Sequence, residues 1–331
     1  MIRRVLGGLR TALSPGGALT KEQVVWAYRL FLDREPESEQ AVLDKLRAWT
    51  TTQDLRRDFL VSPEFRERNP SSAGYLNAPT IVLAELPDGS RLFVDLADVA
   101  IGLNVARDLY EPSETTFVKS AVCRGQSVID IGANIGYYSV LMASLVGSTG
   151  NVTAYEPLEN NARLLERSVA ENELEKVVSL RRVALGASRS SAELVYLPLE
   201  TGALNSGGAY LATAGGKLPP LHRTQAVSVE PLDEQELPRP VSFMKVDVEG
   251  AEPLVFRGGR SLLTTDRPTI LSEINPTQLK AVSGIGGAEL ISEMRELGYR
   301  CRILVDGAPG AEVTHFDSDS VRSVVFQPHG R

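Results

Sequence analysis

One stretch constrains the fold of this 331-residue chain more than any other: residues 128–136, VIDIGANIG. Its apolar positions are β-branched, as in a strand buried in a parallel sheet: Val128, Ile129 and Ile131. Asp130 interrupts this apolar run. Small or turn-forming residues then alternate at Gly132, Asn134 and Gly136, and an amphipathic stretch follows. Strand, glycine turn and helix in this order are typical of a cofactor crevice in an open α/β sheet.

Strand and helix patterns alternate after this stretch. Apolar, β-branched runs predict strands at 151–155, 177–184, 192–196, 226–229, 241–246, 269–274, 300–305 and 322–326. Helical spacing predicts helices at 160–172, 252–263 and 289–297. Parallel neighbours need crossover connections, so this alternation predicts a doubly wound, mainly parallel sheet. We expect seven strands in this α/β sheet, with the last two forming an antiparallel pair.

The chain before this sheet divides into shorter segments. We expect a flexible N-terminus (1–19), a small all-α domain (20–68), a linker (69–79) and a catalytic domain (80–331). Thr20 and Gln23 have the spacing of a capping box at the start of the first helix. The aromatic spacing in the helical segment favours a small bundle core, with a partner-binding groove as the alternative. Residues 80–86 and 91–94 predict a hairpin, and residues 98–121 look helical.

Composition excludes several classes of function. The formal charge of −7 argues against a duplex nucleic-acid partner, which favours a clustered basic surface. Cys123 and Cys301 form no disulfide framework or metal motif, so we expect packed, reduced thiols in a cytoplasmic protein. No apolar run reaches the ~20 residues of a membrane helix. The basic N-terminus predicts a frayed end or, alternatively, a weak contact with an anionic membrane surface.

The turn at 132–136 narrows the choice of cofactor. G-x-N-x-G lacks the spacing of the dinucleotide fingerprint G-x-G-x-x-G, and the chain has no P-loop. Glu156 ends the next predicted strand, where a carboxylate can accept hydrogen bonds from both ribose hydroxyls. S-adenosylmethionine fits: Asp130 would meet its ammonium or sulfonium side, and the turn amides its carboxylate. The structural alternatives are a turn or capping role for Asp130 and a surface carboxylate for Glu156.

Residues 243–252, FMKVDVEGAE, place three acids and a lysine at the carboxyl end of an apolar strand. With this segment the chain resembles the FkbM family of S-adenosylmethionine-dependent methyltransferases. The resemblance covers residues 80–327 and rests on residues 130–138, 155–157, Asn172, 205–207, 229–233, 245–252 and 268–273, with residues 110–112 and Glu114 upstream. It implies a class I methyltransferase (Rossmann-like) sheet and O-methylation of a sugar or polyketide hydroxyl. Residues 28–36 and 59–65 resemble a small helical domain of unknown function found beside bacterial glycosyltransferases and methyltransferases.

The candidate cofactor-binding residues are Asp130, Gly132, Asn134, Gly136, Glu156 and Ala184. Methyl transfer to an alcohol needs positioning of both reactants and a base for the hydroxyl proton, or a divalent cation such as Mg²⁺ that lowers its pKa. The candidate catalytic residues are Asp247, Lys245, Glu249, His222 and Asn205. The candidate metal ligands are Asp247, Glu273 and Asn275, at two adjacent strand ends.

Each of these residues also has a structural interpretation. Asp247 can cap a helix, and Glu249 and Glu252 precede and open one, where carboxylates favour the helix dipole. Lys245 can pair with a carboxylate, and we expect Lys245 and Asp247, one residue apart, to lie on opposite faces. On the structural interpretation, His222 is a loop residue unrelated to catalysis and Asn205 is a turn residue.

The sequence thus predicts an S-adenosylmethionine-dependent O-methyltransferase. Its acceptor is a hydroxyl of a sugar, glycolipid, glycan or polyketide-type natural product, and the protein acts alone or as a homodimer. Two rivals remain: a nucleotide- or dinucleotide-dependent enzyme, and a non-catalytic scaffold of glycan assembly.

Overall fold

The computed structural model describes residues 19–62, 64–65, 80–198, 208–212, 218–219, 221–315 and 320–330. Contacts divide the chain into two compact units, Met1–Pro79 and Thr80–Arg331. Three sequence predictions lie outside the described residues: those for residues 1–18, for the linker at 69–79 and for Asn205. Among the described residues, no helix is long and apolar enough to cross a membrane.

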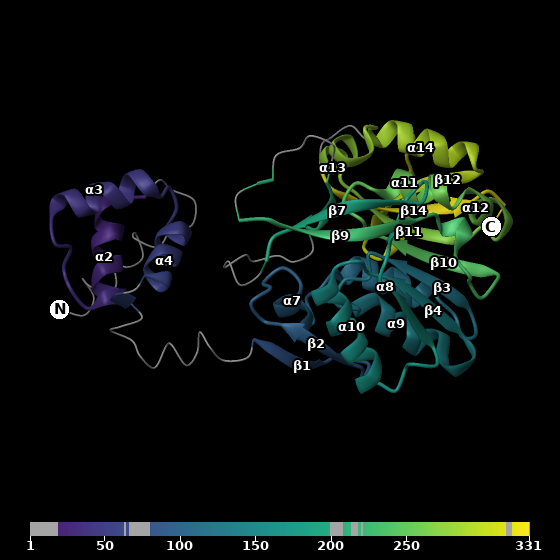
Figure 1. The fold of residues 1–331 in the computed structure, drawn as a ribbon, viewed down its shortest axis with the longest axis horizontal. Helices are drawn as coiled ribbons and strands as arrows, with labels where there is room; N and C mark the ends of the chain where they lie inside the picture. Colours follow the sequence, from purple (N-terminus) through teal and green to yellow (C-terminus); the bar gives the residue numbers. More distant parts are fainter. Residues whose placement is uncertain are drawn as a thin grey trace. The chain divides into compact units, whose positions relative to one another are not determined.

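The described part of the first unit contains three helices, α2 (Lys21–Leu32), α3 (Glu39–Ala48) and α4 (Thr52–Val61) (Figure 1). Each begins at a hydroxyl side chain that accepts a backbone hydrogen bond, the usual way to satisfy a free helix N–H; these N-caps are Thr20, Ser38 and Thr51. The predicted capping box is confirmed, since Thr20 and Gln23 exchange both hydrogen bonds.

These three helices share one apolar core. Its buried members are Val24, Ala27, Tyr28, Leu32, Val42, Leu55 and Phe59. An ion pair also joins the two segments that resemble a small helical domain, residues 28–36 and 59–65. Arg34 donates to both carboxylate oxygens of Glu64, at 2.6 and 2.7 Å, and its guanidinium lies over the ring of Tyr28. Such a two-pronged arginine contact adds geometric specificity to the charge attraction.

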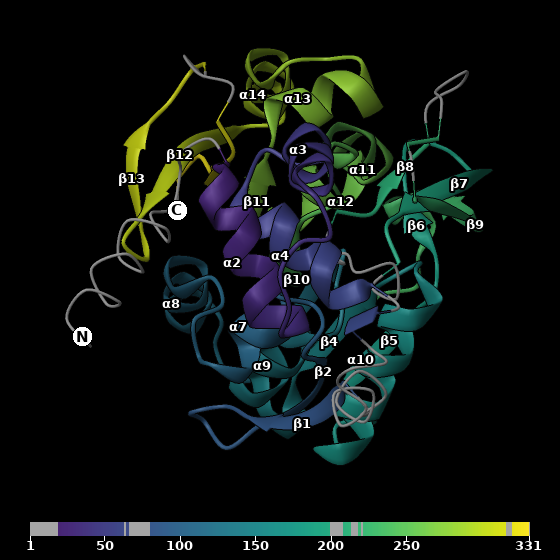
Figure 2. The same cartoon turned by 90° about the vertical axis from the view of Figure 1, so that its left-hand side faces the viewer.

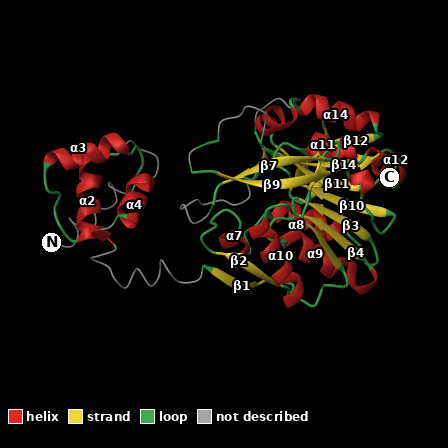
Figure 3. Ribbon diagram, viewed as in Figure 1, coloured by secondary structure: helices red, strands yellow, loops and turns green. Residues whose placement is uncertain are grey.

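The second unit is built on a large twisted sheet (Figures 2 and 3). Its described strands run in the order β13-β12-β14-β11-β10-β3-β4-β5. Pairing is parallel from β11 to β5 and antiparallel from β13 to β11. The bounds are β3 (Ser127–Ile131), β4 (Asn151–Tyr155), β5 (Val178–Arg181), β10 (Val241–Val246), β11 (Thr269–Ile274), β12 (Tyr299–Val305), β13 (Ala308–Glu312) and β14 (Arg322–Pro328).

Two smaller sheets accompany it. β1 (Ile81–Glu85) and β2 (Arg91–Asp95) form the predicted hairpin. A second sheet has the order β6-β9-β7-β8, with bounds β6 (Ala184–Leu185), β7 (Ser190–Tyr196), β8 (Tyr210–Leu211) and β9 (Arg223–Glu230). The predicted strands at 192–196 and 226–229 therefore pair with each other outside the main sheet.

Helices cover both faces of the main sheet (Figure 1). On one face lie α8 (Pro112–Ala121), α9 (Tyr137–Val146) and α10 (Glu159–Glu171). On the other lie α11 (Glu252–Gly258), α12 (Arg260–Thr265) and α14 (Gly287–Glu296). The connections include α7 (Gly102–Ala106), η1 (Gly147–Thr149), η3 (Leu232–Glu234), α13 (Pro276–Gln278) and η4 (Leu279–Ser283).

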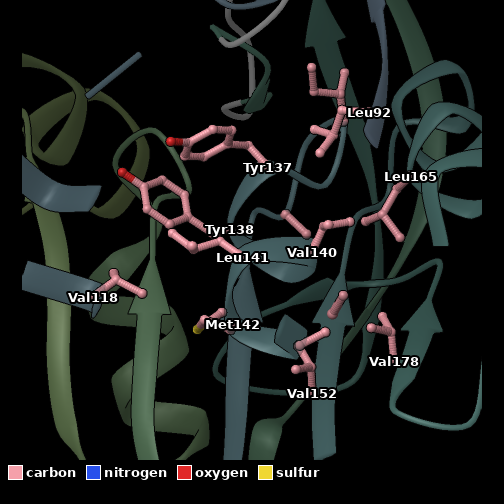
Figure 4. Close-up of a cluster of buried hydrophobic side chains, with 14 of the residues drawn as sticks. Leu92, Val118, Tyr137, Tyr138, Val140, Leu141, Met142, Val152, Leu165 and Val178 are labelled. Atoms are coloured by element: carbon pink, nitrogen blue, oxygen red, sulfur yellow. The ribbon is translucent and has the colours of Figure 1, made fainter. Parts of the chain in front are cut away.

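The two faces carry separate apolar clusters, because successive side chains of a strand alternate between them. Val128 packs with α9 and α10, and its neighbour Ile129 packs with the other layer. Figure 4 shows the cluster around α9, with the hydroxyls of Tyr137 and Tyr138 turned to the same side. That side bears on the functional site described below.

The α/β doubly wound fold and the antiparallel pair β12–β14 are confirmed. The prediction of seven strands was wrong, since eight described strands form the sheet. The additional strand, β13, has the sequence APGAE, which lacks the β-branched residues that mark a strand. This segment is a strand because it pairs with β12 across a tight turn at Asp306 and Gly307.

Candidate functional site

The glycine turn brings three strand ends together. Gly132 has φ +79°, and a Cβ there would lie 1.8 Å from the backbone oxygen of Asp247. The backbone amides of Gly132 and Ala133 both donate to the backbone carbonyl oxygen of Tyr155, each at 3.0 Å. Only glycine permits this close approach, because any side chain would collide with the backbone of the neighbouring strand end. The turn thus joins the ends of β3, β4 and β10.

Glu156 stands at the end of β4 and is buried. Its two carboxylate oxygens accept from the backbone N–H groups of Asn134 and Leu158, each at 2.8 Å. Burial raises the pKa of Glu156 to about 7, although these two hydrogen bonds lower it. A carboxylate oxygen can accept more than one hydrogen bond. Glu156 therefore keeps capacity to accept from a ligand diol while the turn holds it in place.

A pocket opens beside Glu156 and extends to the end of β10. It brings together six of the predicted site residues: Gly132, Asn134, Glu156, Ala184, Asp247 and Glu249. Apolar walls come from β3, β4 and the small sheet, including Ile131, Val183, Leu185, Leu194 and Leu211. Apolar walls with a few converging polar groups are typical of a small-molecule site. A buried carboxylate acceptor between apolar walls fits a nucleoside with a free ribose.

Asp130 lies next to this pocket in the sheet and is fully buried. Its Oδ2 accepts from the Ser139 hydroxyl at 2.6 Å, while Oδ1 has no partner among the described residues. Burial raises the pKa of Asp130 to about 6, and the nearby Lys245 charge lowers it. A buried carboxylate oxygen without a donor costs free energy unless a ligand or water supplies one.

The predicted role of the turn amides is not supported. The amides of Gly132 and Ala133 are bonded to Tyr155, that of Asn134 to Glu156, and that of Ile135 to the Asn134 side chain. An N–H that already donates within the protein has little left for a carboxylate ligand. The turn shapes the crevice and fixes Glu156, and Gly136 lets it pass close to Leu165.

Lys245 and Asp247 lie on the same face of β10. The Lys245 Nζ donates to Asp247 Oδ2 at 3.0 Å. The expectation that they would lie on opposite faces was wrong, because side chains two residues apart in a strand share a face. Lys245 is also beside Asp130 in the register of β10 and β3. Burial lowers the pKa of Lys245, but Asp247, Glu111 and Asp130 together hold it above its usual value.

Further acids surround this ion pair. Burial and, after it, the Asp247 charge raise the pKa of Glu249 to about 7 and that of Glu273 to about 8. Glu273 lies one step beyond the last paired residues of β10 and β11, on the face of Lys245. Glu249 has φ +49°, a left-handed conformation that is uncommon in a residue with a side chain. The strand ends thus carry several carboxylates around one ammonium.

The sequence analysis did not predict three residues of this cluster as site residues: Glu111, Tyr138 and Tyr110. Glu111 precedes α8, and its Oε2 accepts from the Tyr138 hydroxyl at 2.7 Å. Burial raises the pKa of Glu111, Lys245 lowers it, and hydrogen bonds from Tyr138 and Tyr110 also lower it. The Lys245 ammonium lies 4.7 Å from the centre of the Tyr138 ring. The available signals were the Tyr-Glu-Pro segment at 110–112 and a tyrosine directly after the glycine turn.

The proposed cation site does not fit the described residues. They contain no group of three or more His, Cys, Asp or Glu side chains arranged to hold a metal ion. The Asn275 Oδ1 accepts from the Gln278 amide and begins α13, so it has a structural role. Asp247 is paired with Lys245.

The remaining predicted residues lie elsewhere. His222 directly precedes β9 and is not among the residues that line the pocket. Glu252 is buried, and its Oε1 accepts from the amides of Val248 and Gly250, which closes the loop after β10. Asn172 exchanges hydrogen bonds with the Arg91 backbone and so fastens α10 to β2. Asp233 accepts from Ser261 and Leu262 at the start of α12. These last three contacts are structural.

Comparison with known families decides the class of this site. The family described as methyltransferase FkbM domain matches residues 130–301, more than half of the chain. The chain belongs to the FkbM methyltransferase family. This assignment confirms the predicted resemblance and supports S-adenosylmethionine as the methyl donor. No curated protein matches the chain.

Solved structures of FkbM and other methyltransferases are similar to the chain at low identity. The FkbM methyltransferase of Methylobacillus flagellatus KT is 12% identical, with 92% of this chain and 59% of that chain covered and a TM-score of 0.39. The chain thus spans less than two thirds of that protein. An S-adenosylmethionine-dependent O-methyltransferase of Thermotoga maritima is 14% identical, with 78% and 82% covered and a TM-score of 0.39.

Proposed function

We propose that the protein transfers a methyl group from S-adenosylmethionine to a hydroxyl of a sugar, glycan or polyketide-type acceptor. The observation that carries the proposal is the continuity of one pocket from Glu156 to Asp247 and Glu249. One end offers a buried carboxylate for a ribose, and the other offers carboxylates that can receive a proton. Both lie at the carboxyl ends of parallel strands, where open α/β sheets bind ligands.

Glu156 would hold the ribose hydroxyls, and Asp130, with its unpartnered Oδ1, would face the ammonium of the methionine end. The cofactor supplies a methyl group already activated by its sulfonium. The protein must then place the acceptor hydroxyl in line and remove its proton. Positioning can lower such a barrier by about 7–11 kcal/mol in favourable models, and a general base contributes ~10²–10⁴-fold.

Asp247 is the base that we favour. It lines the pocket, and its second carboxylate oxygen is not the one bonded to Lys245. Lys245 is unsuited to this role, because the surrounding carboxylates keep its ammonium protonated. Its place is to orient Asp247 and balance its charge. The catalytic role of His222 remains a prediction, since it is not among the pocket-lining residues, and that of Asn205 concerns a residue outside the described part of the chain.

Titration of the folded protein with S-adenosylhomocysteine in a calorimeter tests the cofactor assignment. Saturable binding at micromolar concentration is expected, and a folded protein that shows none would refute it. A protein that binds S-adenosylhomocysteine but transfers no labelled methyl group supports the scaffold alternative. A protein that binds NAD and not S-adenosylhomocysteine supports a dinucleotide-dependent enzyme.

A transfer screen with tritiated S-adenosylmethionine then addresses the acceptor. Sugars, glycolipid headgroups and polyketides are supplied in turn, and labelled products are analysed for the position of the methyl group. A base-stable methyl ether supports O-methylation. Labelling at nitrogen or carbon would contradict it and leave the broader class of methyltransferase intact.

A further inference from the structure

We propose that Glu111 is a positioning residue for methyl transfer. It acts through Tyr138 and Lys245 to hold the Asp247 carboxylate beside the methyl group of the bound cofactor. This inference rests on the function proposed above. Its starting point is the backbone of Glu111, which has φ 41° and ψ 61° and precedes Pro112.

That conformation is unfavourable for this residue. A residue before proline favours extended backbone, and the left-handed region costs a non-glycine residue on the order of 1–3 kcal/mol. Such a conformation persists only where surrounding contacts impose it, and functional sites are where it is most often found. Asn134 and Glu249, which line the pocket, also have positive φ, at 51° and 49°.

Contacts on three sides hold the first turn of α8 in place. They tie it to the β12–β13 turn, to β14 and to α9. The Ser113 Oγ accepts from the Gly307 amide at 2.9 Å, the Ser323 hydroxyl donates to Glu114 at 2.5 Å, and the Thr115 and Tyr137 hydroxyls are 3.1 Å apart. None of these contacts involves the Glu111 carboxylate, whose Oε2 accepts from the Tyr138 hydroxyl. The fold therefore places Glu111 and does not depend on its charge for that placement.

A continuous series of contacts leads from Glu111 to the pocket. The Tyr138 hydroxyl donates to Glu111 at 2.7 Å, and the Lys245 ammonium lies 4.7 Å from the Tyr138 ring centre. Lys245 then donates to Asp247 at 3.0 Å. Of these four residues only Asp247 lines the pocket. Glu111 is thus a residue that acts through others, whereas Asp247 meets the ligand.

The charges give this series a direction. Lys245 is buried, and the groups that face it come from β3, β10, α8 and α9: Asp130, Asp247, Glu111 and Tyr138. When Glu111 shares the ammonium, Asp247 keeps part of its negative potential for a cation in the pocket. Without the Glu111 charge, Lys245 is balanced more by Asp247 and repels that cation more strongly.

Two ligands that differ at the transferred methyl test this directly. S-adenosylhomocysteine lacks the methyl and its charge, whereas sinefungin carries a protonated amine at that place. Calorimetry at pH 8 with wild type should show binding of both. E111Q should weaken sinefungin by about tenfold, because Lys245 is then balanced more by Asp247, and should leave S-adenosylhomocysteine within about twofold.

Y138F removes the connecting hydroxyl and keeps the ring beneath Lys245. It should weaken sinefungin by about threefold, and the double variant should bind no more than about twofold worse than E111Q, because contacting residues are not additive. E114Q is the matched control. It makes the same change three residues away, where the amide oxygen can still accept from Ser323 and keep that contact of α8, and it should alter neither ligand.

Several outcomes overturn the inference. E111Q with an unchanged ratio of the two affinities, or with an equal loss for both ligands, shows that Glu111 does not act at the methyl position. If E111Q does not fold, as judged by thermal unfolding, an unchanged ratio in Y138F has the same meaning. A wild type that binds neither ligand refutes the proposed function itself.

Discussion

The two ends of the pocket satisfy their carboxylates in different ways. At the ribose end, Glu156 is buried and accepts two backbone hydrogen bonds, from Asn134 and Leu158. At the reactive end, no described backbone N–H donates to the carboxylates of Asp247, Glu249 or Glu273, and Lys245 is the cation that pairs with Asp247. The first arrangement is local and rigid. The second is shared among several elements, so a change in one charge affects the others.

This difference separates binding from chemistry. A carboxylate fixed by backbone amides suits recognition of an unchanging ribose. Burial and neighbouring charges raise the pKa of Glu249 to about 7 and that of Glu273 to about 8, so these two acids can exchange protons near neutral pH, which suits a site that must remove a hydroxyl proton. The following predictions test whether the two ends are as distinct as the geometry indicates.

The largest effect on ligand affinity is expected at the ribose end, from Glu156→Gln. One amide group of the new side chain would face the N–H of Asn134 or Leu158, and donors would then oppose each other in a buried site. We expect S-adenosylhomocysteine to bind about 10²-fold more weakly, or roughly 2.7 kcal/mol. Calorimetry measures this loss. Glu159→Gln, a half-buried ion-pairing acid nearby, is the control, and wild-type affinity in E156Q would contradict the assignment of the ribose site.

The next effect belongs to the reactive end and concerns stability. Lys245→Met removes the buried ammonium and leaves Asp247, Asp130 and Glu111 without their cation. Breaking a buried pair in this way costs about 3–5 kcal/mol. A Tm lower by roughly 10 °C is expected for a unit of this size. Differential scanning calorimetry tests it against Lys119→Met, an exposed lysine on α8, and equal Tm values for the two variants would count against a shared charge cluster.

A smaller effect is expected from pH. Burial raises the pKa of Glu156 and Glu249 to about 7 and that of Glu273 to about 8, above the value of about 4.3 in an unfolded chain. Between these limits the folded protein holds protons that the unfolded chain has released. The free energy of unfolding should therefore fall as pH rises from about 4.5 to 8.

Urea unfolding of the ligand-free protein at pH 5.5, 7 and 8 measures this slope. Glu273→Gln should reduce it, because that acid no longer has to lose a proton in the folded state. Glu312→Gln, an exposed acid on β13, should leave it as in wild type. A stability that rises across this range in wild type would show that the reactive end does not hold its carboxyls as described.

The smallest effect is expected from a chelator. The described residues hold no arrangement of three metal-binding side chains, and Asn275 is used to begin a helix. Methyl transfer in 5 mM EDTA should stay within about twofold of the untreated rate, as expected where positioning and a general base carry the reaction. A loss that Mg²⁺ restores would reverse this view and return Asp247 and Glu273 to the role of ligands.

The sequence by itself determined the α/β sheet, the glycine turn and the placement of Glu156, Asp130 and Asp247 at strand ends. These follow from periodicity and from residues that are neighbours along the chain, such as the turn at 132–136 and the strand before it. The capping box of Thr20 and Gln23 could be read in the same way, because both of its hydrogen bonds lie within one helical turn.

Only the tertiary structure decided the composition of the reactive end. Glu111 and Lys245 are more than a hundred residues apart, and both contact Tyr138 of α9, Glu111 at its hydroxyl and Lys245 at its ring. The tertiary structure also showed that Asn172 and Asp233 bond to segments distant in the sequence, Asn172 to β2 and Asp233 to the start of α12. Asn275 caps the helix that directly follows it. Periodicity tells which face of its own element a residue occupies. The residue that it meets there depends on packing between elements, and this packing determines the charge and the chemistry of the site.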